Sequence, residues 1–242
     1  MNLLILENYD EMSKAAANIV KETIKQKSNS VLGLATGSTP IGMYQELIKM
    51  NKEGNIDFSK VTTVNLDEYI GLGASDDQSY RYFMNKNLFD HINIDKSKTF
   101  IPNGLTKDAE EEGRNYDNKI EELGGIDLQI LGIGNNGHIA FNEPSDFLIC
   151  GTHLTNLTES TINANSRCFK SRDEVPKTAL TMGIKQIMKA KKILLLVKGE
   201  DKAAVTLELL SGKITTNNPA TMLNMHNDVT ILIDKRTSEL IK

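Results

Sequence analysis

Six apolar runs alternate with helical patterns almost from one end of the chain to the other, and this alternation constrains the fold most strongly. The runs, rich in Val, Ile and Leu, cover residues 2–6, 31–35, 61–66, 126–133, 192–197 and 229–233. Helical periodicities lie near residues 10–26, 40–52, 79–89, 107–123, 177–189 and 200–211. Near-continuous apolar strands separated by helices are typical of a parallel sheet covered on both faces. We therefore predict an α/β fold with an open, mostly parallel, doubly wound (Rossmann-like) sheet and helices on both faces.

Charge and length narrow the classes of protein to which this chain can belong. The 242 residues show no repeat, low-complexity tract or linker, so we predict a single domain over residues 1–242. The formal net charge is only −4, and the Lys and Arg residues are scattered. This pattern predicts neither nucleic acid nor a membrane as a partner, so any anionic ligand must be held locally.

Nothing in the sequence indicates export or membrane insertion. No apolar run approaches the ~20 residues of a membrane span. The opening MNLLIL has no basic residue before it, so we interpret it as a strand and not as a signal peptide. Cys150 and Cys168 have neither metal-site nor redox-motif spacing, which favours reduced thiols in a cytoplasmic protein.

In open α/β sheets the ligand lies beyond the carboxyl ends of the strands, and the first such position reads LGLATGSTP, residues 32–40. Gly37 lies in the turn, Thr39 is placed to cap a helix, and Pro40 fits the first helical position. Free backbone N–H groups and the Ser38 and Thr39 hydroxyls would bind a phosphate there. A capped helix without a ligand explains the stretch equally well, since it has neither a P-loop ending nor a dinucleotide fingerprint.

The second position is NLDEY, where Asp67 and Glu68 follow the strand at 61–66. Neighbouring side chains of an extended chain point to opposite sides, so we expect only one of the two carboxylates to face a crevice. A carboxylate there can serve as a base. Solvated acids at a strand exit are the simpler explanation, and the sequence does not choose between the two residues.

The third position is LGIGNNGHIAFNEP, residues 131–144, in which glycines 134 and 137 permit a tight turn before His138. If 138–143 forms a helical turn, His138 and Asn142 share a face and Glu143 lies near its edge. Histidine moves protons near neutral pH, and a neighbouring carboxylate or amide can fix its tautomer. A structural role is the commoner one for a loop histidine. A metal site is not indicated, because HEXXH is absent and no other histidine has a paired spacing with this one.

Taken together, TGSTP, NLDEYIGL, GNNGHIAFNEP and NANSRCF closely resemble the glucosamine-6-phosphate deaminase family, in order from about residue 1 to 235. Members are aldose-ketose isomerases that convert glucosamine 6-phosphate and water to fructose 6-phosphate and ammonia in amino-sugar (N-acetylglucosamine) catabolism. GNNGHIAFNEP with NLDEY upstream is specific, whereas TGSTP is shared with 6-phosphogluconolactonases and sugar-binding regulators. The resemblance implies an enzyme whose small-molecule substrate is a phosphorylated amino sugar.

The resemblance also implies roles for individual residues. Asp67 would abstract the proton from carbon 2 of the opened sugar. His138 would open the pyranose ring, assisted by Asn136 and Glu143. The family pattern requires no metal or organic cofactor. The substrate phosphate would be held by Thr36, Gly37, Ser38, Thr39, Arg167 and Lys202.

The chain departs from the family pattern at Asn136, where many members carry aspartate. An amide can hydrogen-bond to His138, but it cannot stabilise an imidazolium by charge. We hypothesise that Glu143 supplies the missing charge.

A second departure concerns regulation. Hexameric members activated by N-acetylglucosamine 6-phosphate have a longer C-terminal segment and basic residues where this chain has His153 and Thr155, in CGTHLTNL. We predict no activation by that ligand and a monomer or small homo-oligomer. A lid is predicted over residues 145–175, which are rich in Thr and Asn.

Two other functions compete with deamination. A 6-phosphogluconolactonase-like hydrolase would use the same phosphate site, but it needs no carbon 2 base, so NLDEY with GNNGHIAFNEP favours the deaminase. A non-catalytic sugar-phosphate sensor usually accompanies a DNA-binding helix-turn-helix, and this chain begins with a strand. An acid at position 67 and a histidine at 138 also favour turnover over sensing.

Overall fold

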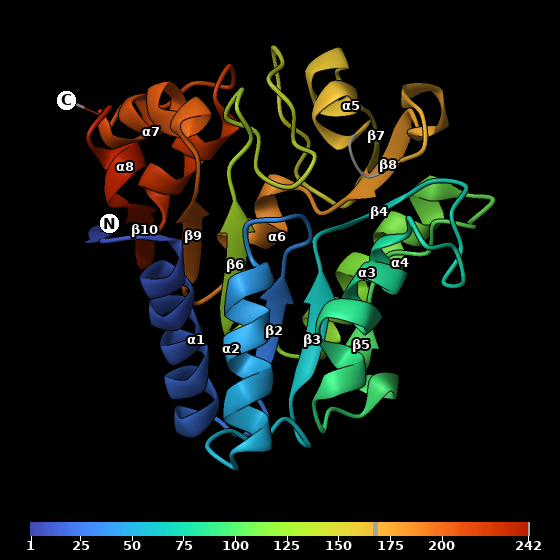
Figure 1. Cartoon of the computed structure of the whole chain (residues 1–242). Helices are drawn as coiled ribbons and strands as arrows, with labels where there is room; N and C mark the ends of the chain where they lie inside the picture. Colours follow the sequence, from blue (N-terminus) through green and yellow to red (C-terminus); the bar gives the residue numbers. More distant parts are fainter. Residues whose placement is uncertain (167–168, 242) are drawn as a thin grey trace.

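Seven parallel strands form the main sheet of the protein, for which a computed structural model describes residues 1–166 and 169–241 (Figure 1). Their order across the sheet is β1-β10-β9-β6-β2-β3-β5. All six predicted strands are present, and the predicted open, mostly parallel α/β fold is confirmed. The one strand of the main sheet that was not predicted is β5, because its two residues form no apolar run. The bounds are β1 Asn2–Leu6, β2 Val31–Leu34, β3 Thr62–Asn65, β5 Thr99–Phe100, β6 Leu128–Gly132, β9 Ile193–Val197 and β10 Val229–Asp234.

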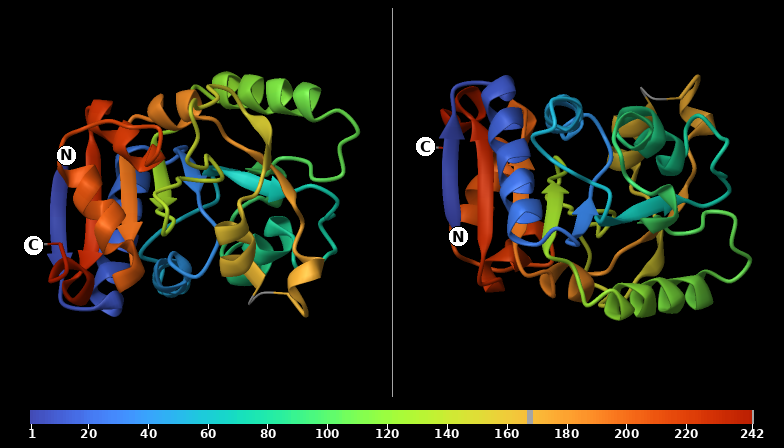
Figure 2. Two further views of the ribbon diagram at one scale, coloured as in Figure 1. Left: turned by 90° about the horizontal axis from the view of Figure 1, so that it is seen from above. Right: turned by 90° about the horizontal axis from the view of Figure 1, so that it is seen from below.

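Helices cover both faces of the main sheet (Figure 2). In β9, Leu194 and Leu196 pack with α1 and α2, whereas Ile193, Leu195 and Val197 pack on the other face with α4, α6 and α7. Because alternate side chains serve two cores, the strand has to be apolar throughout. The helices are α1 Tyr9–Gln26, α2 Ile41–Lys52, α3 Tyr80–Asn87, α4 Ala109–Glu122, α5 Glu159–Asn165, α6 Ile184–Met188, α7 Ala203–Leu210 and α8 Lys235–Ser238.

A second, antiparallel sheet contains β4 (Asp67–Tyr69), β8 (Thr178–Thr181) and β7 (His153–Asn156) in that order. The helix predicted over 177–189 is therefore wrong in its first half, because β8 precedes α6. The apolar spacing there also suits a helix, but β4 and β7 pair with both sides of β8 and hold it extended. Such long-range pairing overrides local preference.

The start of α2 also differs from its prediction. Pro40, and not Thr39, is the N-cap residue, and no side chain of its own turn caps the helix. The phenolic oxygen of Tyr9, on α1, accepts a hydrogen bond from the backbone N–H of Gly42 at 2.8 Å. The same hydroxyl donates to the carbonyl of Thr39 at 2.9 Å. Tyr9 thus satisfies an N–H group that a helix start leaves free.

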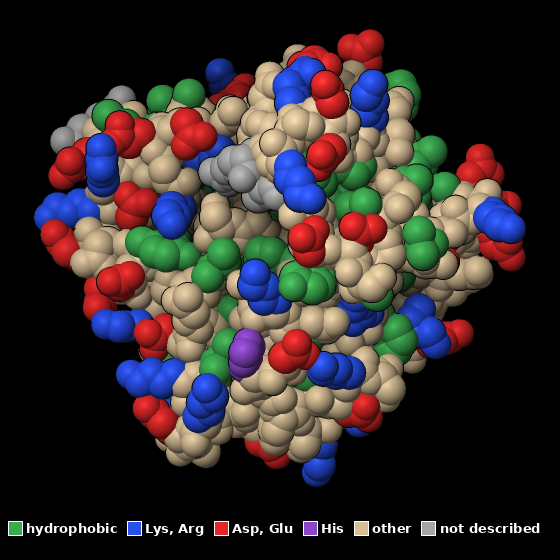
Figure 3. Space-filling model, turned by 45° about the vertical axis from the view of Figure 1, so that its right-hand side comes forward, with side chains coloured by type: hydrophobic (Ala, Val, Ile, Leu, Met, Phe, Trp, Pro, Cys, Tyr) green, Lys and Arg blue, Asp and Glu red, His purple; other side chains and the backbone are tan. Residues whose placement is uncertain are grey.

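Acidic and basic side chains are interspersed over the face of the molecule shown in Figure 3. In the described part of the chain, no helix is both long and apolar enough to cross a membrane. Cys150 is an exposed free thiol, whereas Cys168 lies outside the described residues.

Candidate active site

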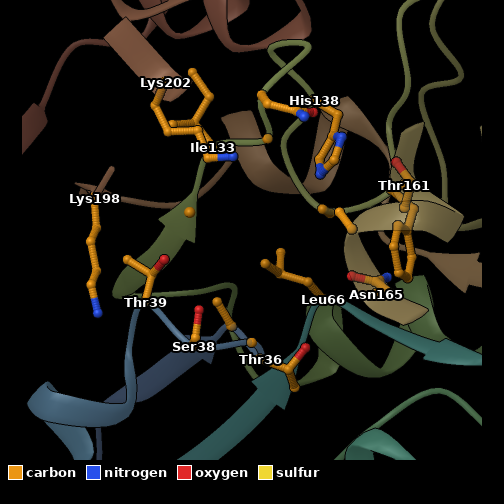
Figure 4. Close-up of a pocket in the computed structure, with 18 of the residues that line it drawn as sticks. Thr36, Ser38, Thr39, Leu66, Ile133, His138, Thr161, Asn165, Lys198 and Lys202 are labelled. Carbon is orange, nitrogen blue, oxygen red and sulfur yellow. The ribbon is translucent and has the colours of Figure 1, made fainter. Parts of the chain in front are cut away.

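The loops after β2, β3, β6 and β9 line a cavity of about 450 Å³ at the carboxyl ends of the main strands (Figure 4). The chain passes from β2 outward to β3 and β5, and then returns to place β6 on the other side of β2. The strand order therefore reverses between β2 and β6, and the cavity lies at this switch point. Open α/β sheets bind their ligands at such a position.

One end of the cavity is formed by the turn after β2, which contributes Thr36, Gly37, Ser38 and Thr39. Gly37 has φ 88°, a backbone conformation that favours glycine. All four of these residues, predicted to bind phosphate, therefore line the same cavity. Arg167, predicted for the same role, lies outside the described residues.

Two lysines from the segment after β9 line the cavity together with this turn. Lys202, predicted from the family resemblance, has its Nζ 2.7 Å from an oxygen of Asp201. Lys198 was not predicted, because the family resemblance singled out Lys202 alone, although Lys198 directly follows the strand predicted at 192–197. Its Nζ lies 3.5 Å from the centroid of the Tyr9 ring, and no acidic partner is found for it among the described residues.

The two acids after β3 face different surroundings. Asp67 lines the cavity, and in the described part of the chain no hydrogen bond or ion pair reaches its carboxylate. Glu68 instead accepts backbone N–H groups of Tyr69, Tyr80 and Arg81 at 2.8 to 2.9 Å. The alternation of side chains along the strand thus presents only Asp67 to the cavity. Burial raises the pKa of Asp67 to about 8, and the nearby Glu68 charge adds to the rise.

The loop that carries His138 is not the helical turn predicted over 138–143. Ala140 has φ 52°, which breaks a right-handed helix, and Ile139 pairs with Asn142 across a tight turn. The Asn142 amide is buried and donates to the carbonyls of Ile139 and Met182. His138 and Asn142 therefore do not share a face.

Gly134 and Gly137 shape this loop for two different reasons. A Cβ on Gly134 would stand 2.3 Å from Cε1 of His138, so the imidazole packs directly on the glycine backbone. Gly137 has φ 86°, and a Cβ there would stand 2.2 Å from Oδ1 of Asn218. Gly134 is required because the imidazole lies too close for a side chain, and Gly137 is required because of its positive φ.

Glu143 lies beside His138, with its Oε2 atom 3.4 Å from the imidazole Nδ1. Asn136 donates its amide to the same oxygen at 2.8 Å, and the Thr161 hydroxyl donates to Oε1. Burial tends to raise the pKa of Glu143, but the contact with His138 and the two donors outweigh it and lower the pKa to about 2. Asn136 does not bond to the imidazole, since its Oδ1 accepts the backbone N–H of His138 at 3.2 Å.

The wall opposite the main sheet comes partly from the predicted lid stretch at 145–175, which contains β7 and α5. Thr161 and Asn165 of α5 line the cavity, and the Asn165 amide donates to the Tyr69 hydroxyl at 2.8 Å. Neither residue was predicted: Asn165 lies within the NANSRCF motif, from which only Arg167 was given a role, and Thr161 lies two residues before that motif. The motion of this segment stays a prediction.

Within 1–166 and 169–241, no group of three or more His, Cys, Asp and Glu side chains is arranged to hold a metal ion. His153, one of the other three histidines, instead contacts the carbonyl of Gly151 through Nδ1 at 2.9 Å.

The chain is similar to known proteins over almost its whole length. The family model of glucosamine-6-phosphate isomerases/6-phosphogluconolactonase matches residues 7–232. A glucosamine-6-phosphate deaminase of Clostridium beijerinckii is 63% identical over 242 residues, which are 100% of both chains. The solved structure of a monomeric glucosamine-6-phosphate deaminase is 48% identical, with a TM-score of 0.97 over 99% of this chain and 100% of that one.

A solved 6-phosphogluconolactonase of Trypanosoma brucei is more distant, at 19% identity and a TM-score of 0.77 over 98% of this chain and 97% of that one. A likeness at that identity shows a shared fold and no more. The specific match is on the deaminase side, where identity reaches 63% over the whole chain. The chain therefore belongs to the family of glucosamine-6-phosphate isomerases and 6-phosphogluconolactonases, and within it to the glucosamine-6-phosphate deaminases.

Proposed function

We propose that the protein converts glucosamine 6-phosphate and water to fructose 6-phosphate and ammonia without a metal or organic cofactor. One observation carries the proposal: the buried Asp67 carboxylate, whose pKa is raised, and His138, which has the Glu143 carboxylate beside it, line the same cavity. Groups whose surroundings push their pKa values apart are suited to separate proton-transfer roles. The full-length similarity to deaminases supports this reaction over lactone hydrolysis, which needs no carbon 2 base.

The first step is opening of the sugar ring. His138 takes the proton of the anomeric hydroxyl and returns it to the ring oxygen, so that the bond from carbon 1 to that oxygen breaks and an aldehyde forms. Glu143 stabilises the imidazolium between the two transfers by its charge. Asn136 acts indirectly in this proposal, through its hydrogen bonds to Glu143 and to the His138 backbone.

Isomerisation and deamination follow. Asp67, once deprotonated, removes the proton from carbon 2, while the carbon 1 oxygen takes up the proton that the substrate ammonium group gives up, so that a neutral enolamine forms. Its raised pKa makes it a stronger base than an ordinary carboxylate. The same carboxyl group returns a proton to carbon 1, which leaves an imine at carbon 2. Water then adds at carbon 2, and ammonia leaves to give the ketose.

The phosphate would lie at the end of the cavity formed by the 36–39 turn, with Lys198 and Lys202 as its cations. We add Lys198 to the predicted phosphate-binding residues. The Asp201 carboxylate already offsets much of the Lys202 charge, so a second cation is needed to balance the phosphate. We expect Lys198→Gln and Lys202→Gln each to raise KM about ten- to hundredfold, the usual loss for a charged hydrogen bond, and to change kcat less. Steady-state kinetics and inhibition by inorganic phosphate test this, with the exposed Lys213→Gln as control. Unchanged KM values would place the phosphate elsewhere.

The function itself is tested by incubating the chelator-treated protein with glucosamine 6-phosphate and measuring both products. Equal amounts of ammonia and fructose 6-phosphate, with almost none from Asp67→Asn, would establish the reaction and its base. If no products form, hydrolysis of 6-phosphogluconolactone distinguishes the lactonase from a non-catalytic sensor.

We infer further that the chain acts as a monomer without activation by N-acetylglucosamine 6-phosphate. The 48% identical monomeric deaminase supports the monomer. Sedimentation equilibrium tests the assembly. A sigmoidal rate curve that the acetylated sugar made hyperbolic would contradict the lack of activation. A cytoplasmic location stays a prediction from the sequence.

A further inference from the structure

We propose that Thr161 is a positioning residue for ring opening: its hydroxyl fixes the Glu143 carboxylate so that one oxygen always faces His138. The proposal rests on the proposed function, because it assigns the ring-opening proton transfers to His138. Nothing in the sequence motifs points to Thr161, which lies on α5, outside the GNNGHIAFNEP segment. Only the fold brings it to Glu143.

A chain of two hydrogen bonds orients the Thr161 hydroxyl. The Thr158 hydroxyl donates to Oγ1 of Thr161 at 3.2 Å, and Thr161 in turn donates to Oε1 of Glu143. Thr158 is also the N-cap residue of α5, where its side chain accepts the N–H of Thr161. Thr161 is 3% exposed, so water does not compete for its hydroxyl.

The two oxygens of Glu143 thereby receive different partners. Thr161 takes Oε1, whereas Oε2 is left for the Asn136 amide at 2.8 Å and for Nδ1 of His138 at 3.4 Å. A carboxylate without the first anchor can turn about its last carbon-carbon bond, which removes Oε2 from the imidazole. The Thr161 bond opposes this rotation.

The orientation of Glu143 determines which nitrogen of His138 carries the proton. A carboxylate oxygen beside Nδ1 favours the proton on that nitrogen and leaves the lone pair on Nε2. His138 Nδ1 is buried and makes no hydrogen bond within the described residues, but the Glu143 carboxylate lies 3.4 Å from it as an ion-pair partner. Because the ring lines the cavity, Nε2 is the nitrogen available to the sugar. Loss of the Thr161 hydroxyl is therefore expected to mix the two tautomers and to slow ring opening without weakening substrate binding.

A simpler role for Thr161 would be to tie α5 to the loop after β6. The chain offers a matched control for that role, because the exposed neighbour Ser160 donates to Oδ1 of Asn135 at 3.2 Å. This second tie joins the same helix to the same loop and does not touch Glu143. Ser160→Ala removes the tie alone, whereas Thr161→Val keeps the shape of the threonine and removes its hydroxyl.

The test is the tautomer of His138, read from the ¹⁵N shifts of its ring, with kcat and KM alongside. We expect Thr161→Val to give mixed tautomers, a kcat lower by about ten- to hundredfold and an almost unchanged KM. Thr161→Ser should restore the wild-type tautomer and most of kcat, and Ser160→Ala should match the wild type. Thr161→Ala replaces the valine variant if that protein does not fold.

Two results would overturn the inference: a wild-type tautomer in Thr161→Val, or equal effects of Thr161→Val and Ser160→Ala. The tautomer is measured without turnover, so its outcome does not depend on the assigned reaction. An inactive wild type would overturn the proposed function and leave the tautomer result standing. If the wild type is active and Thr161→Val has the same His138 tautomer as the wild type, this inference alone is overturned.

Discussion

Two carboxylates of the site are buried to a similar extent: Asp67, which lines the cavity, is 6% exposed, and Glu143, which lies beside His138, is 9% exposed. Asp67 has no hydrogen-bond donor among the described residues, and its pKa is raised to about 8. Glu143 has two side-chain donors and an imidazole beside it, and its pKa falls to about 2. Burial raises the pKa of both acids, and only at Glu143 do hydrogen-bond donors and a neighbouring imidazole outweigh it.

The fold produces this difference by directing two separate sets of hydrogen-bond donors. At the end of β3, the adjacent Glu68 takes the backbone N–H groups at the start of α3, so none of those groups serves Asp67. At the end of β6, the turn and α5 direct their donors toward Glu143. The site thus combines a carboxyl group that lines the cavity and can exchange a proton with a carboxylate beside His138 that stays charged.

Of the substitutions that test this difference between the two acids, Asp67→Asn should have the largest effect on turnover. Loss of a general base costs about 10²- to 10⁴-fold in turnover, and we expect a value near the upper end. In the wild type, kcat/KM should rise with pH toward about 8, because the deprotonated carboxylate is the active form. A wild-type profile that is flat from pH 6 to 9 would contradict the role of Asp67 as base.

Asp67→Asn should lower turnover but raise the stability of the fold. The folded-state pKa of Asp67 lies above its ordinary 3.8, so the stabilising protonated form is fully present below pH 4 and lost as the pH rises through about 8. Asparagine mimics the protonated form. Calorimetry should therefore show Asp67→Asn melting at least about 5 °C higher than the wild type at pH 9, with a smaller difference at pH 5. The exposed Asp77→Asn is the control.

Glu143→Gln should have the next largest effect, because it removes the charge beside His138 and keeps the shape. We expect about a 10²-fold loss in kcat, within the range for a proton-transfer group, and a changed pH profile of turnover. The folded-state pKa lies below the ordinary 4.5, so the carboxylate stabilises the fold above pH 4.5, and that stability is lost as the pH falls toward 2. The melting-temperature difference from the wild type should shrink as the pH is lowered from 7 to 3. An unaltered turnover profile would remove Glu143 from the mechanism.

Asn136→Asp should have the smallest effect on turnover, and it tests whether Asn136 helps to keep Glu143 ionised. It replaces a donor 2.8 Å from Glu143 by a second carboxylate, so one of the two must take up a proton. We expect the variant to lose stability relative to the wild type as the pH rises from 4 to 7, and kcat to change by less than about tenfold, since one hydrogen bond is exchanged. Equal stability of both proteins across that range would show that Asn136 does not help keep Glu143 ionised.

Local sequence patterns predicted six of the seven main strands, because most of these strands are rich in apolar residues, and the rule that ligands lie beyond the carboxyl ends then pointed to the turns that line the cavity. The strand order, and with it the switch point, required coordinates. Local patterns did not predict the second sheet, since β7 and β8 are short and depend on pairing with segments far along the chain. Thr161 was missed because only tertiary packing brings α5 to Glu143. Lys198 was missed although it directly follows β9, where its place beyond the carboxyl end of a strand could have singled it out. The glycines at 134 and 137 were recognised as a turn, but the packing of His138 on Gly134 required coordinates.

The pairing of β1 with β10 joins the first strand of the chain to the last. As the ribosome releases the chain from its N-terminus, β1 waits without a partner until residues beyond 229 have emerged. Leu4 and Ile5 remain 48% and 56% exposed even in the finished fold, so this strand presents apolar surface throughout translation. Chaperone capture of nascent chains should therefore be strongest at this segment and end when β10 is released.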